Sequence, residues 1–134
     1  MREIKWPVRV YLEDTDAQGV VYNASYFRFM ERARTEWLRV RGIDHDSTRA
    51  RHGVLFVLTA IEARFRAPAR LSDLLEVSAQ AVEARGARVI FNQSIRNAGS
   101  GDLLCEGRAE VACMDADRGK PRRWPENLLR ELVK

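Results

Sequence analysis

The sequence is poor in the residues that build metal centres, disulfide frameworks and redox sites. Among 134 residues there are two cysteines, Cys105 and Cys113, and two histidines, His45 and His52. The cysteines are too few and too far apart for a zinc cluster or a CxxC redox pair, so we expect no metal site and no disulfide framework. A reducing cytoplasm fits this cysteine usage. Both histidines lie in a polar segment without an evident partner, which favours solvated loop side chains.

Long apolar runs are also missing. No stretch approaches the ~20 apolar residues that span a bilayer, and the first ten residues, MREIKWPVRV, hold no apolar signal-peptide core. We therefore expect no membrane span and no export. The chain has no internal repeat or low-complexity segment. Its 134 residues, 46% of them hydrophobic, suit one domain (1–134) with a real core.

The charge balance is only mildly basic. The chain carries 23 Lys and Arg against 19 Asp and Glu, a net charge of +4. This excess permits an anionic partner, either nucleic acid or a phosphate-bearing cofactor, and does not choose between them. A nucleic-acid-binding domain would need a recognition helix rich in exposed basic residues or an aromatic stacking platform, and neither is evident. We therefore expect no nucleic-acid partner.

One long amphipathic helix dominates the first third of the chain. Asn23 is a good N-cap residue and Gly42 a natural C-terminal stop, which predicts a helix of about five turns. Apolar residues recur at helical spacing and form one stripe. The stripe consists of Tyr26, Phe29, Met30, Ala33, Trp37 and Val40.

Strand patterns flank this helix. Residues 5–13 alternate, with Trp6, Val8, Val10 and Leu12 on one face. Residues 44–53 read as a polar loop or a broken helix, and the apolar, β-branched run 54–65 predicts a central strand.

Three more strands, 74–84, 87–96 and 103–115, follow with short connections, and a short helix closes the chain. Cys105 and Cys113 share one parity on the last strand, and Gly107 between them marks a possible bulge. Segregated helix and hairpins predict an α+β fold, with the sheet curled around the long helix that must bury its stripe.

The stretch RVYLEDTDAQGVVYNASYFRFMERARTEWLR resembles the signature of the hotdog-fold acyl-CoA thioesterases. It is most similar to the 4-hydroxybenzoyl-CoA thioesterase superfamily and, within it, to the Tol–Pal-associated branch. Weaker agreement continues through FRAPARLSDLLEV, RGARVIF and KPR. The resemblance implies a five-stranded antiparallel sheet wrapped around one central helix, an acyl-CoA substrate, and a homodimer or homotetramer with active sites between subunits. It implies no separate cofactor, because CoA is part of the substrate.

The resemblance also assigns the catalytic carboxylate to Asp16, the last residue of the DTD run. Many members of the branch have a histidine where this chain has Asn23. The backbone N–H of Asn23, together with that of Ala24, offers an oxyanion donor at a helix N-terminus, and this role does not need the histidine. Asp16 would act as nucleophile or as general base. Glu13 and Asp14 are expected to support the turn, and without the resemblance Asp16 itself would read as a turn former.

Two arginines are candidates for contacts with the phosphates of CoA. Arg85 and Arg88 flank a tight turn that related enzymes use near the nucleotide, and guanidinium groups bind phosphate well. Solvated surface charge is the alternative for both. The alternative for the whole protein is a non-catalytic domain that binds acyl thioesters or acyl-carrier protein without hydrolysis.

Overall fold

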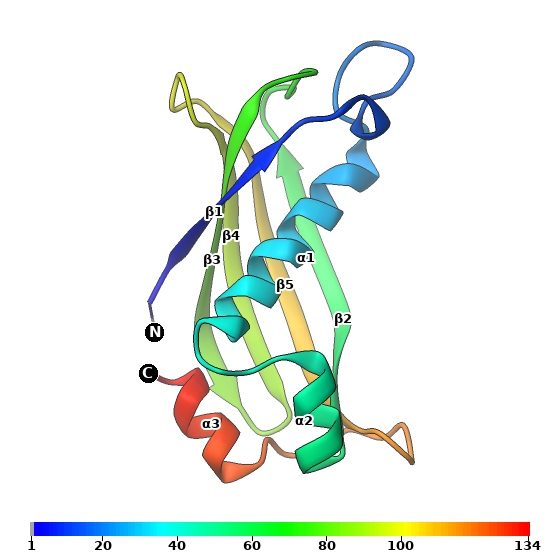
Figure 1. The fold of residues 1–134 in the computed structure, drawn as a ribbon, viewed down its shortest axis with the longest axis vertical. Helices are drawn as coiled ribbons and strands as arrows, with labels where there is room; N and C mark the ends of the chain where they lie inside the picture. The colour runs from blue at the N-terminus through cyan, green and yellow to red at the C-terminus, as the bar shows by residue number, and fades with distance from the viewer. Residues whose placement is uncertain (1) are drawn as a thin grey trace.

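The computed structural model describes residues 2–134. Its sheet has five strands: β1 (Ile4–Arg9), β2 (Val54–Phe65), β3 (Leu74–Arg85), β4 (Arg88–Asn97) and β5 (Leu103–Asp115). They pair antiparallel throughout, in the order β1-β3-β4-β5-β2. Figure 1 shows α1 (Asn23–Arg39) crossing the face of the curled sheet. The predicted α+β architecture, a five-stranded antiparallel sheet around a long helix, is confirmed.

The apolar stripe of α1 is the reason why the sheet curls around it. Phe29, Met30 and Trp37 are fully buried, and the Trp37 ring meets Phe91 of β4 edge-on, with ring centroids 5.3 Å apart. Each such buried aromatic or Met side chain contributes about 1.5–3 kcal/mol by leaving water. Val40 was expected in this stripe, which is wrong: it is the C-cap residue after the last helical residue, Arg39, and is 67% exposed.

Two short helices lie together at one end of the sheet, on the side where both termini emerge (Figure 1). The polar segment expected as a loop or broken helix forms α2 (His45–His52), and α3 (Glu126–Leu132) is the predicted terminal helix. The carboxylate of Asp44 accepts from the N–H of Ser47 at 2.8 Å and caps α2. Gly53 ends it with φ of 65°, a conformation that suits glycine.

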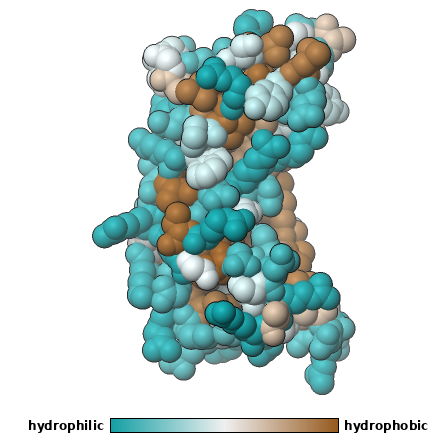
Figure 2. All heavy atoms as spheres, in the orientation of Figure 1, coloured by the Kyte–Doolittle hydropathy of each residue, from teal (hydrophilic) through white to brown (hydrophobic). Residues whose placement is uncertain are grey.

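Strand β2 lies at an edge of the sheet, so its prediction as a central strand was wrong. Several of its apolar side chains are consequently exposed, among them Leu58 (44%) and Phe65 (47%). Figure 2 shows brown and tan surface down the side of the molecule where β2 runs. An apolar sequence indicates that a strand is buried. It does not show whether the strand is buried within its own sheet or against another molecule.

The first strand is shorter than its alternating pattern. Val8 and Val10 are buried as predicted, whereas Trp6 and Leu12 are exposed, against the prediction. Pairing with β3 stops at Arg9, and residues Leu12–Asp14 turn into one 3₁₀ turn (η1), so the strand alternation no longer applies at Leu12.

Gly107 makes no bulge, which corrects the prediction for this residue. The pairing of β5 runs through it without a shift on either side. A Cβ at this position would stand 2.8 Å from Sδ and Cε of Met30, so the glycine makes room for α1. Cys105 and Cys113 are both buried on this same face and both are free thiols, as their shared parity predicted.

None of the helices within residues 2–134 has the length and apolar content that a membrane crossing requires.

Candidate active site

The turn that carries Asp16 is closed by backbone hydrogen bonds. The N–H of Asp16 donates to the carbonyl of Val20 at 2.9 Å, and the N–H of Gly19 donates back to the carbonyl of Asp16 at 3.0 Å. A β-bridge between Thr15 and Val21 holds the base of the loop. Gly19 has φ of 79° and open space around it, so the backbone conformation, not crowding, calls for glycine here. The loop is therefore held at both ends.

The Asp16 side chain is half-buried on this loop. Its Oδ1 accepts from the N–H of Gln18 at 2.8 Å, the geometry of an Asx-turn. Its Oδ2 accepts no hydrogen bond from any residue in the range 2–134. One oxygen of the carboxylate thus accepts a hydrogen bond within the turn, and the other oxygen is available for another partner.

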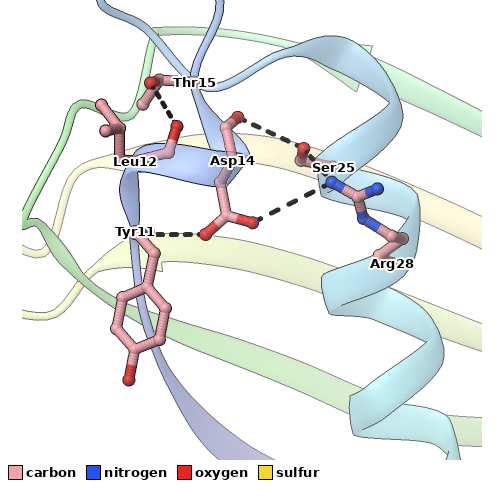
Figure 3. A network of polar contacts seen from close by, with 6 residues as sticks. All are labelled: Tyr11, Leu12, Asp14, Thr15, Ser25 and Arg28. Atoms are coloured by element: carbon pink, nitrogen blue, oxygen red, sulfur yellow. Dashed lines mark hydrogen bonds and ion pairs between the residues drawn. The ribbon is translucent and has the colours of Figure 1, made fainter.

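Asp14, two residues earlier, is the anchor of the loop. It is only 4% exposed, and its Oδ2 accepts from the N–H of Tyr11 at 2.8 Å. Its carbonyl accepts from the hydroxyl of Ser25 at 3.2 Å, and Arg28 donates to that hydroxyl at 2.8 Å. Figure 3 shows this network tying the turn after β1 to the first turns of α1. The predicted supporting role of Asp14 within the turn is confirmed.

Helix α1 begins at Asn23, one residue before the predicted start. Tyr22 is the N-cap residue, with φ of −68° and ψ of 141°, and Asn23 is the first helical residue. The prediction that the Asn23 side chain caps the helix was therefore wrong. Among the described residues, none accepts from the backbone N–H of Asn23 or Ala24, as is usual for the first turn of a helix. These two donors lie at the positive end of the helix dipole.

A hollow of about 250 Å³ opens beside this helix start. Asn23, Tyr26, Phe65 and Pro68 contribute to its lining, and Asp16 does not. The Tyr26 hydroxyl accepts from the N–H of Ala69 at 3.0 Å, and burial raises the pKa of Tyr26, so the hydroxyl stays protonated at neutral pH. The hollow combines apolar walls with backbone and hydroxyl donors, and can receive a small polar group with an apolar attachment.

Arg85 and Arg88 lie at the other end of the sheet. They face each other across the β3–β4 turn, and Nη1 of Arg88 donates to Glu110 at 2.7 Å. Residues 70–73, just before β3, bond to the Asp16 loop and to Val10, just after β1. Arg85 lies eleven positions further along the strand than Leu74, about 36 Å at the usual rise per residue. Within one chain these arginines are thus remote from Asp16.

Sequence reasoning missed a buried polar pair formed by Arg34 and Gln93. Arg34 is 7% exposed and Gln93 5% exposed, and Nη1 of Arg34 donates to Oε1 of Gln93 at 2.9 Å. Two signals in the sequence were available. Gln93 shares strand parity with Phe91 and Ile95, and Arg34 lies four residues after Met30 on the helix.

Residues 2–134 contain no group of three or more His, Cys, Asp or Glu side chains arranged to hold a metal ion.

The sequence model of the thioesterase-like superfamily matches residues 10–132. The chain belongs to this superfamily. It is 45% identical to the acyl-CoA thioester hydrolase YbgC of Escherichia coli O157:H7 over 128 residues, which are 96% of this chain and 94% of that protein. It is 39% identical to the acyl-CoA thioesterase YbgC of Haemophilus influenzae over 124 residues, 92% of this chain and 89% of that protein. The predicted family is thereby confirmed.

Solved structures agree with the fold. A 1,4-dihydroxy-2-naphthoyl-CoA thioesterase from Synechocystis superimposes with a TM-score of 0.91, covering 99% of this chain and 97% of that one, at 23% identity. At this identity the likeness concerns the fold alone, and it confirms the hotdog arrangement.

Proposed function

We propose that the protein hydrolyses acyl-CoA thioesters to a free acid and CoA. The observation that carries the proposal is that the backbone N–H groups of Asn23 and Ala24 have no hydrogen-bond acceptor among the described residues. These two residues begin α1 beside the hollow and come shortly after the loop of Asp16. The two YbgC relatives, both named as acyl-CoA hydrolases, support the same activity.

The chemistry needs a donor for the thioester oxygen and an acceptor for a proton. The N–H groups of Asn23 and Ala24 hydrogen-bond the carbonyl oxygen as it becomes an oxyanion, a contribution worth roughly 2.7–4 kcal/mol per donor in a comparable hydrolase. As general base, Asp16 takes a proton from water while the water oxygen bonds to the carbonyl carbon. The C–S bond then breaks and the CoA thiolate leaves. As nucleophile, Asp16 attacks that carbon itself, the C–S bond breaks with departure of the CoA thiolate, and water hydrolyses the resulting anhydride.

Asn23 in place of the branch's histidine is compatible with this chemistry. A thiolate with a pKa near that of cysteine, about 8.5, leaves without a strong general acid. The oxyanion donors are main-chain groups, so they do not depend on the side chain at position 23. One available carboxylate oxygen and two N–H groups are then a sufficient set.

We propose that two copies pair through the exposed edge of β2. An edge strand with exposed apolar side chains is a template for pairing with another chain. Antiparallel pairing of two full β2 strands sets Phe65 of one copy opposite Val54 of the other, because both strands run from 54 to 65. The hollow beside Asn23 then faces the end of the second copy from which Arg85 and Arg88 project, where they are candidates for the CoA phosphates.

The decisive experiment compares Asp16→Asn with the wild type on short, long and aromatic acyl-CoA substrates. Asparagine can keep the hydrogen bond from Gln18, so folding should persist while hydrolysis is lost. Asp102→Asn, on an exposed hairpin loop, is the matched control. Near-wild-type turnover by Asp16→Asn would reject the mechanism. Binding of the substrates without turnover by the wild type would favour a non-catalytic acyl-thioester or acyl-carrier-protein binder, in the cytoplasm in either case.

A further inference from the structure

A second cavity lies between α1 and the sheet, away from the hollow beside Asn23. Its volume is about 120 Å³. Most of its wall is apolar, contributed by α1 and by strands β2, β4 and β5. The apolar wall consists of Leu38, Phe56, Leu58, Val89, Phe91 and Val111. A cavity of this kind is suited to an apolar group about as large as benzene, which fills an engineered cavity of ~150 Å³.

A buried guanidinium group interrupts this apolar wall. Arg34 lines the cavity and is 7% exposed. Its partner Gln93 is held in one orientation, because its Nε2 donates to the carbonyls of Met30 at 2.9 Å and Ser78 at 3.1 Å. Oε1 of Gln93 therefore points at Arg34 and accepts from Nη1. The buried cation is held by a neutral acceptor.

The charge of Arg34 has no paired anion among the described residues. Burial lowers the pKa of Arg34, and the nearby Glu31 carboxylate opposes that shift without forming an ion pair. Glu31 is exposed at the rim and accepts from the Thr35 hydroxyl at 3.0 Å. Arg34 lines the cavity, and Nη1 is the guanidinium nitrogen that donates to another residue in the range 2–134, which leaves Nε and Nη2 without such a bond. A buried cation in this state gains from a carboxylate that accepts two N–H groups at once.

The geometry points to a short acyl group that ends in a carboxylate as the ligand of this cavity, with Arg34 as the residue that selects it. The methylene groups of such an acyl chain lie against Phe56, Phe91 and their apolar neighbours, and the terminal carboxylate pairs with Arg34. Glu31 repels that carboxylate, but water screens the charge of this exposed residue. The attraction to the buried Arg34 is screened much less and therefore outweighs the repulsion.

This inference rests on the proposed thioesterase function and on β2 pairing. Arg34 lies eleven positions after Asn23 on the helix, about 16 Å along the axis, which a short acyl group in one chain does not span. In the paired arrangement, Phe56 of the second copy lies opposite Ala63 of the first, two residues from Phe65 in the wall of the hollow. The acyl end therefore enters the cavity of the second copy.

The test compares glutaryl-CoA with pentanoyl-CoA, which have acyl chains of five carbons with and without the terminal carboxylate. The wild type is expected to favour glutaryl-CoA in kcat/KM by at least about tenfold, the scale of one charge-assisted hydrogen bond. Arg34→Met keeps the length of the side chain and should abolish that preference. Arg34→Lys should keep part of it, and Glu31→Gln should increase it. Arg39→Met, an exposed arginine on the same helix, is the control that should leave the ratio unchanged.

Binding of pentanoate and of its neutral amide, pentanamide, measured by calorimetry on the same variants, separates this inference from the proposed function. Pentanoate is expected to bind the wild type at least about tenfold more tightly than pentanamide, with the difference lost in Arg34→Met. If no thioester is hydrolysed but this difference holds, the hydrolase proposal fails and the carboxylate site stands. Equal binding of pentanoate and pentanamide by the wild type, or equal losses on both thioesters in Arg34→Met, overturns the inference. The wild-type comparison decides even if Arg34→Met does not fold.

Discussion

Replacing Asn23 with proline removes one backbone N–H from the proposed site, together with the Asn23 side chain. Proline is well accepted at the first helical position, because the N–H there has no partner within the helix. Tyr22, which would precede the proline, already has ψ of 141°, the extended conformation that this position prefers. We therefore expect the free energy of unfolding of Asn23→Pro to stay within about 1 kcal/mol of the wild type.

The catalytic loss should be large by comparison. One oxyanion donor is worth about 10²–10³ in kcat, or roughly 2.7–4 kcal/mol. Because Ala24 offers a second donor, we expect a loss near the lower end of that range. The effect should fall on kcat more than on KM, since the donor acts on charge that develops in the transition state.

The assay follows release of the CoA thiol at saturating substrate, with thermal unfolding monitored by circular dichroism on the same samples. Asn23→Ala is the matched control, because it removes the side chain and keeps the N–H, and it should retain kcat within about threefold. The proposed oxyanion role of the Asn23 N–H is refuted if folded Asn23→Pro keeps wild-type kcat. It is equally refuted if Asn23→Ala loses as much as Asn23→Pro, because the side chain would then carry the role.

Three further perturbations test the fold and the pairing. Gly107→Ala should lower the free energy of unfolding in urea by about 1–3 kcal/mol, because the new Cβ meets Met30, and the penalty should shrink in a Met30→Ala background. An equal penalty in both backgrounds would show that the contact is not the cause. Burial raises the pKa of both cysteine thiols to about 11, so a thiol reagent should leave the native protein unlabelled at pH 8. Since the folded state holds these protons more tightly, stability should fall as pH rises from 9 towards 11, and a rise in the melting temperature over that interval would contradict this. Ala60→Glu places two carboxylates near the centre of a β2–β2 pair and should weaken self-association at least about tenfold in sedimentation equilibrium. The control Ala50→Glu lies on α2, and equal association of the two variants would exclude pairing through β2.

Local patterns anticipated most of the architecture. The stripe of α1 and the hairpin connections from β3 to β5 depend on periodicity and on turn residues, which are written in short stretches of sequence. The EDTDAQGVVY motif located the turn with Asp16 and the start of α1 within one residue. The predictions for Val40, Leu12 and Gly107 were among those that were wrong. The environment of these side chains depends on where the chain turns or on a packing contact, and not on the spacing of apolar residues.

The turn that carries Asp16 and the antiparallel hairpins could therefore be predicted from the sequence alone, because each rests on neighbours along the chain. The catalytic roles of Asp16 and of the Asn23 N–H stay predictions. The edge position of β2 and the hydrogen bond between Arg34 and Gln93 were decided by the tertiary structure. Strand order and the closure of a cavity depend on contacts between residues far apart in sequence, and the cost of leaving a buried charge or an exposed apolar edge appears only once those contacts exist.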